Sequence, residues 1–151
     1  MKFPKPIRLP REAYADPGRM FHIVIRAAIQ TKPFADRSLA QAVWNQLTDE
    51  CGHGQIVLAA ACLMPDHLHL LARREGLDLV TWANRFKSRT TNLSWTFGWR
   101  GALWQPSFYD RYVRDHSEFE SVRSYIVRNP VEAGLVTTPE AWPWLSVWDD
   151  E

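Results

Sequence analysis

The sequence predicts an α+β fold in which one antiparallel sheet is covered by helices mainly on one face. Its periodic segments follow the order β-α-β-β-α-β-α, and a break of two residues joins the two central strands. With 151 residues, of which 46% are hydrophobic, the chain is large enough for one domain with a substantial core. Two helical crossovers that flank a central hairpin are typical of a ferredoxin-like, or RRM-like, arrangement.

The first half of the chain supplies an arm, a strand and a helix. Residues 1–20 are rich in proline and in basic side chains, which predicts an extended N-terminal arm. Residues 21–28 are rich in β-branched residues and favour a strand. Residues 36–50 show helical spacing behind Asp36 or Ser38, either of which suits the N-cap position.

The central hairpin is predicted from the apolar runs 55–64 and 67–73, separated by Pro65 and Asp66. Residues 77–95 regain helical periodicity, and residues 104–113 read as a loop that enters a short strand.

The last predicted helix covers residues 117–128. Ser117 and Glu120 form a capping-box pattern at its start, and Pro130 is expected to close it. A Trp- and Pro-rich, acidic tail completes a single domain over residues 21–151.

Composition argues against a membrane-spanning, secreted or disulfide-rich protein, and the distribution of charge is compatible with DNA binding. No apolar run is long enough to span a bilayer, no secretory signal is evident, and the two cysteines are too few for a disulfide framework, so we expect a cytoplasmic protein. The net charge of +1 hides strong segregation, because residues 1–37 carry +5 and residues 132–151 carry −5. A basic DNA-binding face is therefore compatible with a nearly neutral chain.

Two pairs of residues suggest chemistry. His67 and His69 lie two apart on a predicted strand and so share one face, which makes them a plausible metal-ligand pair. Tyr125 and Asn129 lie four apart on the last predicted helix. Each pair alone has an ordinary structural explanation, as core histidines, a core aromatic or a helix terminator. Together they suit phosphodiester transesterification by a tyrosine beside a divalent cation.

Longer motifs resemble a known family. The stretch 64–71 (MPDHLHLL) resembles the His-hydrophobe-His signature of the HUH single-strand nucleases. The stretches 104–105, 108–111, 113–115 and 125–136 (YIVRNPVEAGLV) resemble the REP-associated tyrosine transposases, a single-tyrosine branch of the HUH transposases. The resemblance extends over about residues 19–144. Many members carry a basic C-terminal extension, whereas this chain ends in three acidic residues.

The resemblance implies a catalytic Tyr125 and a Mg²⁺ or Mn²⁺ ion bound by His67, His69 and Asn129. It also implies cleavage and strand transfer of single-stranded or hairpin DNA through a 5′-phosphotyrosine. From the residues alone, Tyr109 and Tyr112 compete as nucleophiles. Related transposases include dimers that exchange the tyrosine helix, so monomer and homodimer both stay open.

Several basic side chains are candidates for contacts with DNA phosphates. They are Arg85, Lys87, Arg89, Arg111, Arg114, Arg123 and Arg128. Two other functions stay open: a catalytically silent DNA-binding protein, and a small hydrolase that uses a two-histidine metal site and water.

Overall fold

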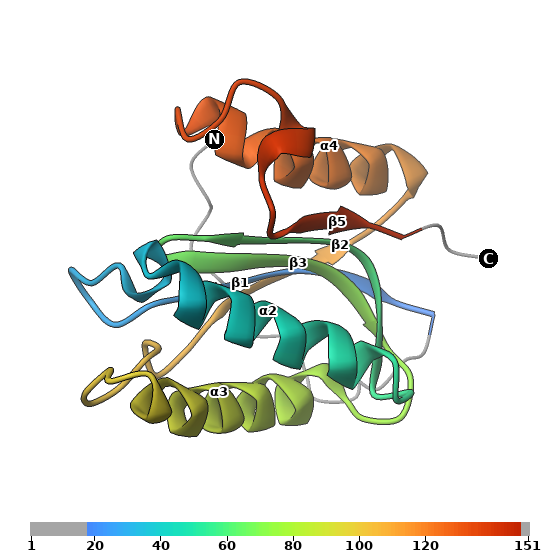
Figure 1. The fold of residues 1–151 in the computed structure, drawn as a ribbon. Helices are drawn as coiled ribbons and strands as arrows, with labels where there is room; N and C mark the ends of the chain where they lie inside the picture. The colour runs from blue at the N-terminus through green and yellow to red at the C-terminus, as the bar shows by residue number, and fades with distance from the viewer. Residues whose placement is uncertain (1–17, 149–151) are drawn as a thin grey trace.

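The computed structural model describes residues 18–148 and contains one five-stranded antiparallel sheet of order β4-β1-β3-β2-β5 (Figure 1). The strands are β1 (Met20–Arg26), β2 (Ile56–Met64), β3 (His67–Arg74), β4 (Tyr109–Val113) and β5 (Leu145–Val147). The helices are α2 (Arg37–Cys51), α3 (Leu79–Thr96) and α4 (His116–Glu132), with 3-10 turns η1 (Pro33–Ala35) and η2 (Pro139–Ala141). The predicted fold class and the predicted order of elements are confirmed. None of the helices between Gly18 and Trp148 has both the length and the apolar character needed to cross a bilayer.

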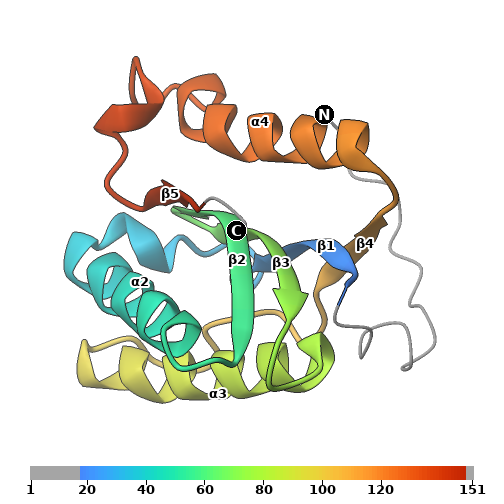
Figure 2. The same ribbon diagram turned by 90° about the vertical axis from the view of Figure 1, so that its right-hand side faces the viewer.

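The sheet separates two layers. Helices α2 and α3 lie together on one face, and α4 lies on the opposite face (Figures 1 and 2). Side chains alternate between these layers along β1. Ile23 and Ile25 belong to the core between the sheet and helices α2 and α3, whereas His22 contacts Tyr125 of α4. The even-numbered residues of β1 therefore face the α4 layer.

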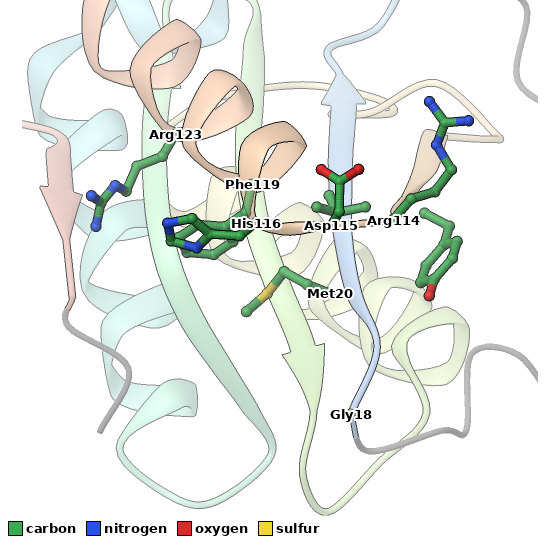
Figure 3. A pocket seen from close by; sticks show the side chains of 9 residues that line it. Gly18, Met20, Arg114, Asp115, His116, Phe119 and Arg123 are labelled. Atoms are coloured by element: carbon green, nitrogen blue, oxygen red, sulfur yellow. The ribbon is translucent and has the colours of Figure 1, made fainter.

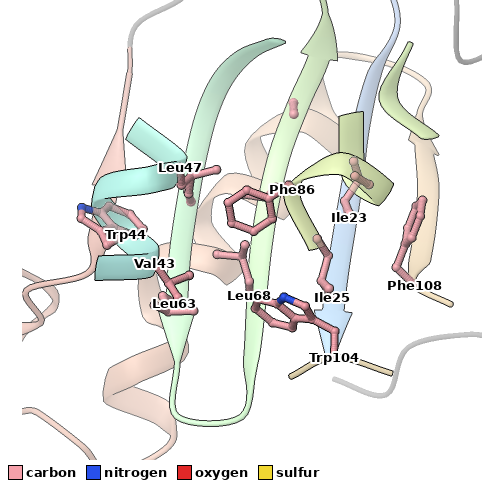
Figure 4. Packing of buried hydrophobic residues seen from close by; sticks show 14 of the residues in the cluster. Ile23, Ile25, Val43, Trp44, Leu47, Leu63, Leu68, Phe86, Trp104 and Phe108 are labelled. Atoms are coloured by element: carbon pink, nitrogen blue, oxygen red, sulfur yellow. The ribbon is translucent and has the colours of Figure 1, made fainter. Parts of the chain in front are cut away.

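The main core lies between the sheet and the α2–α3 layer (Figure 4). Phe86 from α3 is fully buried there, and Val43 and Leu47 of α2 join the same cluster. Trp104, from the loop before β4, packs against Phe34 and donates a hydrogen bond of 2.8 Å from its indole Nε1 to Thr90 Oγ1. The bulky indole is thus buried with its polar atom satisfied.

The start of the acidic tail adds a fifth strand that the sequence pattern did not indicate. Ser146 pairs with Ala61 of β2, and the Trp142 indole donates to the Leu63 carbonyl at 2.9 Å. Most of the predicted N-terminal arm, residues 1–17, and the acidic residues 149–151 lie outside the described residues, while Met20 already belongs to β1.

Helix α4 differs from its prediction at both ends. Its N-cap is Asp115, whose carboxylate accepts from the Glu118 backbone N–H at 2.8 Å, so the expected cap at Ser117 is wrong. The pattern Asp115-x-x-Glu118 starts two residues before the predicted capping box, and the helix begins at this earlier pattern. Pro130 does not end the helix either but lies within its last turn. Asn129 therefore stays helical, one turn beyond Tyr125.

Candidate active site

The predicted metal ligands meet at the start of β3. His67 Nε2 and His69 Nε2 lie 3.0 Å apart on the face of the sheet that α4 covers. Two ligands at neighbouring corners of an octahedral site with bonds of about 2.1 Å would be separated by about 3.0 Å. The spacing of the two nitrogen atoms therefore fits a shared divalent cation.

Both imidazoles use their other nitrogen atom to hold an orientation. His67 Nδ1 lies 2.7 Å from Asp66 Oδ1, and His69 Nδ1 lies 3.2 Å from His22 Nε2. Because the Asp66 carboxylate can only accept, the proton of His67 resides on Nδ1 and its Nε2 lone pair faces His69. Metal-binding histidines commonly have partners of this kind, which fix the tautomer and the ring orientation.

Burial keeps the inner histidines neutral. Burial, and to a smaller extent the positive charge of Arg111, together lower the pKa of His22 to about 4. The pKa of His69 is well below its ordinary value, chiefly because of burial, with further contributions from His67, His22 and Arg26. Neutral imidazole is the form that binds a metal ion.

The ring of Tyr125 packs against the rings of His69 and His22. Its ring centroid is 5.5 Å from that of His69 and 6.2 Å from that of His22, edge-on in both cases. Burial raises the pKa of Tyr125, and the nearby Glu132 acts in the same direction. A side-chain hydrogen bond with Asn129 and the charge of Arg26 both act to lower it. The pKa of Tyr125 is raised overall, so the protonated phenol is the favoured form, and Asn129 and Arg26 only partly offset the effect of burial.

The geometry also separates the three candidate tyrosines. Tyr112 packs against Phe21, which belongs to the core on the other side of the sheet. Tyr109 lies 5.9 Å from His22, measured between ring centroids, and burial is the main factor that raises its pKa. Of the three, Tyr125 has the ring contact with His69.

Asn129 is brought next to Tyr125 as the helical spacing predicts. Among residues 18–148, no three side chains drawn from His, Cys, Asp and Glu gather into a possible metal site. Asn129, the third ligand that the resemblance implies, is of another type and would offer an amide oxygen.

The candidate DNA-contacting arginines on β4 and α4 are paired with glutamates. Arg111 and Arg114 both pair with Glu118, at 3.4 and 3.1 Å. Arg123 pairs with Glu120 at 2.9 Å, and Arg128 pairs with Glu132 at 3.4 Å. The Arg128–Glu132 pair is exposed on both sides, and pairs of this type contribute little to stability, so exchanging its glutamate for a DNA phosphate costs little.

Two of these arginines border a pocket at the start of α4. Figure 3 shows Arg114 and Arg123 on opposite sides of it, with Asp115 and the stacked rings of His116 and Phe119 between them. Arg111 lies opposite His22 in the register of β1 and β4, and its charge therefore acts on the pKa of that imidazole.

The structure places Arg85, Lys87 and Arg89 on α3, across the sheet from Tyr125. Lys87 Nζ donates to the Pro106 carbonyl at 3.0 Å, and Arg89 forms an ion pair with the buried Glu50. These three side chains are therefore not brought together with the histidine pair.

Sequence reasoning missed two residues of the site, His22 and Arg26. Both lie on the even-numbered face of β1, and the Cα register pairs Arg26 with His67 and Val24 with His69. Alternation along β1 was a usable signal, because it places His22 and Arg26 on one face. The sequence did not indicate that β1 pairs with β3, and this pairing is what brings His22 and Arg26 to the site.

Comparisons with known proteins identify the family of this chain. The family model described as "Transposase IS200 like" matches residues 18–129. A REP-associated tyrosine transposase of Escherichia coli is 26% identical over 89 residues, which cover 58% of this chain and 52% of that protein. A Haemophilus influenzae protein named as a member of the same group is 29% identical over 112 residues, which cover 66% of this chain and 64% of that protein. The chain thus spans less than two thirds of the length of either relative.

Solved structures support the same fold. A REP-associated tyrosine transposase bound to a REP hairpin superposes with a TM-score of 0.72 at 17% identity, covering 100% of this chain and 93% of that one. A Deinococcus radiodurans protein named as a transposase gives a TM-score of 0.53 at 19% identity, covering 83% of this chain and 95% of that one. The resemblance to the REP-associated group is confirmed, and the chain belongs to the IS200-like transposase family.

Proposed function

We propose that this protein cleaves and rejoins single-stranded DNA near hairpins, with Tyr125 as the nucleophile. The observation that carries the proposal is the contact between the Tyr125 ring and His69, whose Nε2 lies 3.0 Å from that of His67. The relatives named above are transposases, and one of them was solved with a REP hairpin. That similarity supports DNA of this kind as the substrate.

The chemistry is a transesterification. The Tyr125 hydroxyl oxygen bonds to the phosphorus, the bond from phosphorus to the 3′ oxygen breaks, and the 5′ phosphate stays on the tyrosine. The phenol proton passes to water, and the departing oxygen gains one to become a free 3′-OH. Attack by a 3′-OH on the phosphotyrosine reverses these steps and joins strands.

A Mg²⁺ or Mn²⁺ ion fits the donor set. We propose that His67, His69 and Asn129 hold it, because the Nε2 atoms of the two imidazoles lie 3.0 Å apart and Asn129 lies beside the nucleophile. When bound, the cation would polarise the phosphate and offset its negative charge. The ring contacts with His69 and His22 orient the phenol.

The proposed site is complete within one chain. Tyr125 and both histidines come from the same protomer, so we propose cleavage in cis, which a monomer can perform. Of the predicted phosphate contacts, we propose Arg111 and Arg128 for the strand that enters the site, since Arg111 lies opposite His22 in the register of β1 and β4 and Arg128 follows Tyr125 by three residues on α4.

Covalent capture tests the proposal. A library of DNA single strands, each with a hairpin and a randomised flank, is labelled at the 3′ end and incubated with Mn²⁺ and protein. We expect the label to migrate with the protein on a denaturing gel, because a 5′-phosphotyrosine retains the 3′ part of the strand. Tyr125→Phe should abolish this band and leave binding intact. Tyr109→Phe is the matched control and should keep it.

The other outcomes identify the alternatives. DNA binding without any adduct in the wild-type protein would indicate a silent DNA-binding protein. Metal-dependent cleavage that survives Tyr125→Phe, without an adduct, would indicate a two-histidine hydrolase.

A further inference from the structure

A second pocket, of about 440 Å³, opens beside the histidine pair where β1 ends. Its walls include Arg26, Lys32, His67 and Gln105. We propose that this pocket binds the nucleotide next to the scissile phosphate, with Arg26 and Lys32 at its phosphate and Ile29 against its base. The inference rests on the proposed function and specifies where the strand leaves the site.

The charge of the pocket suits a phosphate. Arg26 and Lys32 are both exposed, while the acidic residue in the lining, Asp66, already has one carboxylate oxygen engaged by His67 Nδ1. Arg26 lies directly across from His67 in the register of β1 and β3. A phosphate held by Arg26 would therefore adjoin the one that Tyr125 attacks.

The loop that forms the pocket is held in place by backbone contacts. The Ala27 N–H donates to the Asp66 carbonyl at 2.8 Å, and the Ala28 N–H donates to the Leu103 carbonyl at 2.9 Å. Gln105 Nε2 donates to the Ala27 carbonyl at 3.0 Å. The walls are thus fixed before any ligand arrives, which lowers the entropic cost of binding.

Two features of the same loop favour a nucleotide over a free phosphate. Ile29 lies between the pocket-lining residues Ala28 and Gln30 and is 75% exposed, so its side chain is accessible to a base. The next residue, Gln30, has a φ of 62°, in the left-handed region that non-glycine residues seldom adopt. Strained backbone of this kind concentrates at binding sites. An exposed apolar side chain can pack on an unstacked base.

Binding of a short fluorescent oligothymidine tests the pocket without any chemistry. Each neutralised phosphate contributes about −0.7 to the slope of log affinity against log salt for single strands, and both side chains are proposed to hold one phosphate, so Arg26→Ala/Lys32→Ala should make the slope shallower by about 0.7. The control, Arg37→Ala/Arg100→Ala, removes the same charge from two exposed positions outside the pocket lining, at the start of α2 and in the loop after α3, and should leave the slope unchanged. Equal changes in both double variants would overturn the proposal.

The apolar contact has its own control. Ile29→Ala should weaken binding about tenfold without a change of slope, because it removes apolar contact and no charge. Val147→Ala, at a side chain that is 52% exposed on β5, should leave affinity unchanged. Unchanged affinity in Ile29→Ala would overturn the assignment of a base to this loop.

The result is separable from the proposed function. If wild-type protein forms no DNA adduct, the proposed chemistry fails while the binding series still tests the pocket. If adducts form but the pocket variants bind and react like the wild type, the chemistry stands and the pocket proposal is wrong.

Discussion

Acid should destabilise this protein through His22. The side chain is 3% exposed and lies between the rings of His69, Tyr109 and Tyr125, and burial lowers its pKa to about 4. In the unfolded chain the same imidazole returns to its ordinary pKa of 6.5. As the pH falls, the unfolded chain therefore takes up this proton before the folded protein does.

The sign and size of the effect follow from the two pKa values. A depressed folded-state pKa on a base means that the stabilisation is complete above pH 6.5 and is lost as the pH falls toward about 4. The full loss is about 3 kcal/mol. Between pH 7 and pH 5 the loss from His22 alone is about 2 kcal/mol.

Urea denaturation at pH 7 and pH 5 measures this loss. His22→Gln removes the titrating group and keeps a polar side chain, so the free energy of unfolding of the wild type relative to this variant should fall by about 2 kcal/mol on acidification. His116→Gln, at an exposed position on α4, is the control and should follow the wild type. Parallel pH profiles for wild type and His22→Gln would refute the reasoning.

Two further substitutions test the metal site and the helix that carries the nucleophile. Asp66→Asn should reduce Mn²⁺ affinity about 10- to 100-fold, measured by calorimetry, because His67 Nδ1 loses its carboxylate partner. The matched variant Asp49→Asn, beside the exposed His53, should leave Mn²⁺ affinity unchanged. An equal loss of affinity in that variant would contradict the role of Asp66 in orienting His67. Asp115→Ala should lower the free energy of unfolding by about 1 kcal/mol through loss of the α4 N-cap, whereas Ser117→Ala should have little effect. The reverse order would contradict the observed cap.

The sheet and its helices were predictable because their signals are local. The apolar run of β2 and the helical spacing of α2 behind Asp36 report directly on burial and capping. Strand β5 left no such signal, since it is three residues long and its pairing with β2 depends on the finished sheet. At α4, two overlapping capping patterns competed, and which residue wins depends on how the chain leaves β4.

The sequence was enough to pair the candidate site residues but not to identify the residues that pack against them. His67 and His69 share a face by strand alternation, and Tyr125 and Asn129 share one by helical spacing. The partners of these residues come from β1, whose register beside β3 sets His22 at the inner imidazole and Arg26 opposite His67. Pairing between strands distant in sequence cannot be read from local periodicity, so these two residues emerge from the structure.

The placement of α4 links packing to chemistry. Three residues of this helix are buried, Tyr125, Ile126 and Pro130. Within residues 18–148 no second α-helix lies beside it on its face of the sheet, whereas α2 and α3 lie together on the other face. Tyr125 is therefore both the proposed nucleophile and part of what holds α4 to the sheet, through its ring contacts with His69 and His22. The same contacts bury the two imidazoles and keep them neutral, which is the state that a metal ion requires. A change at any one of these three side chains thus alters the attachment of the helix, the protonation of the ligands and the position of the phenol together.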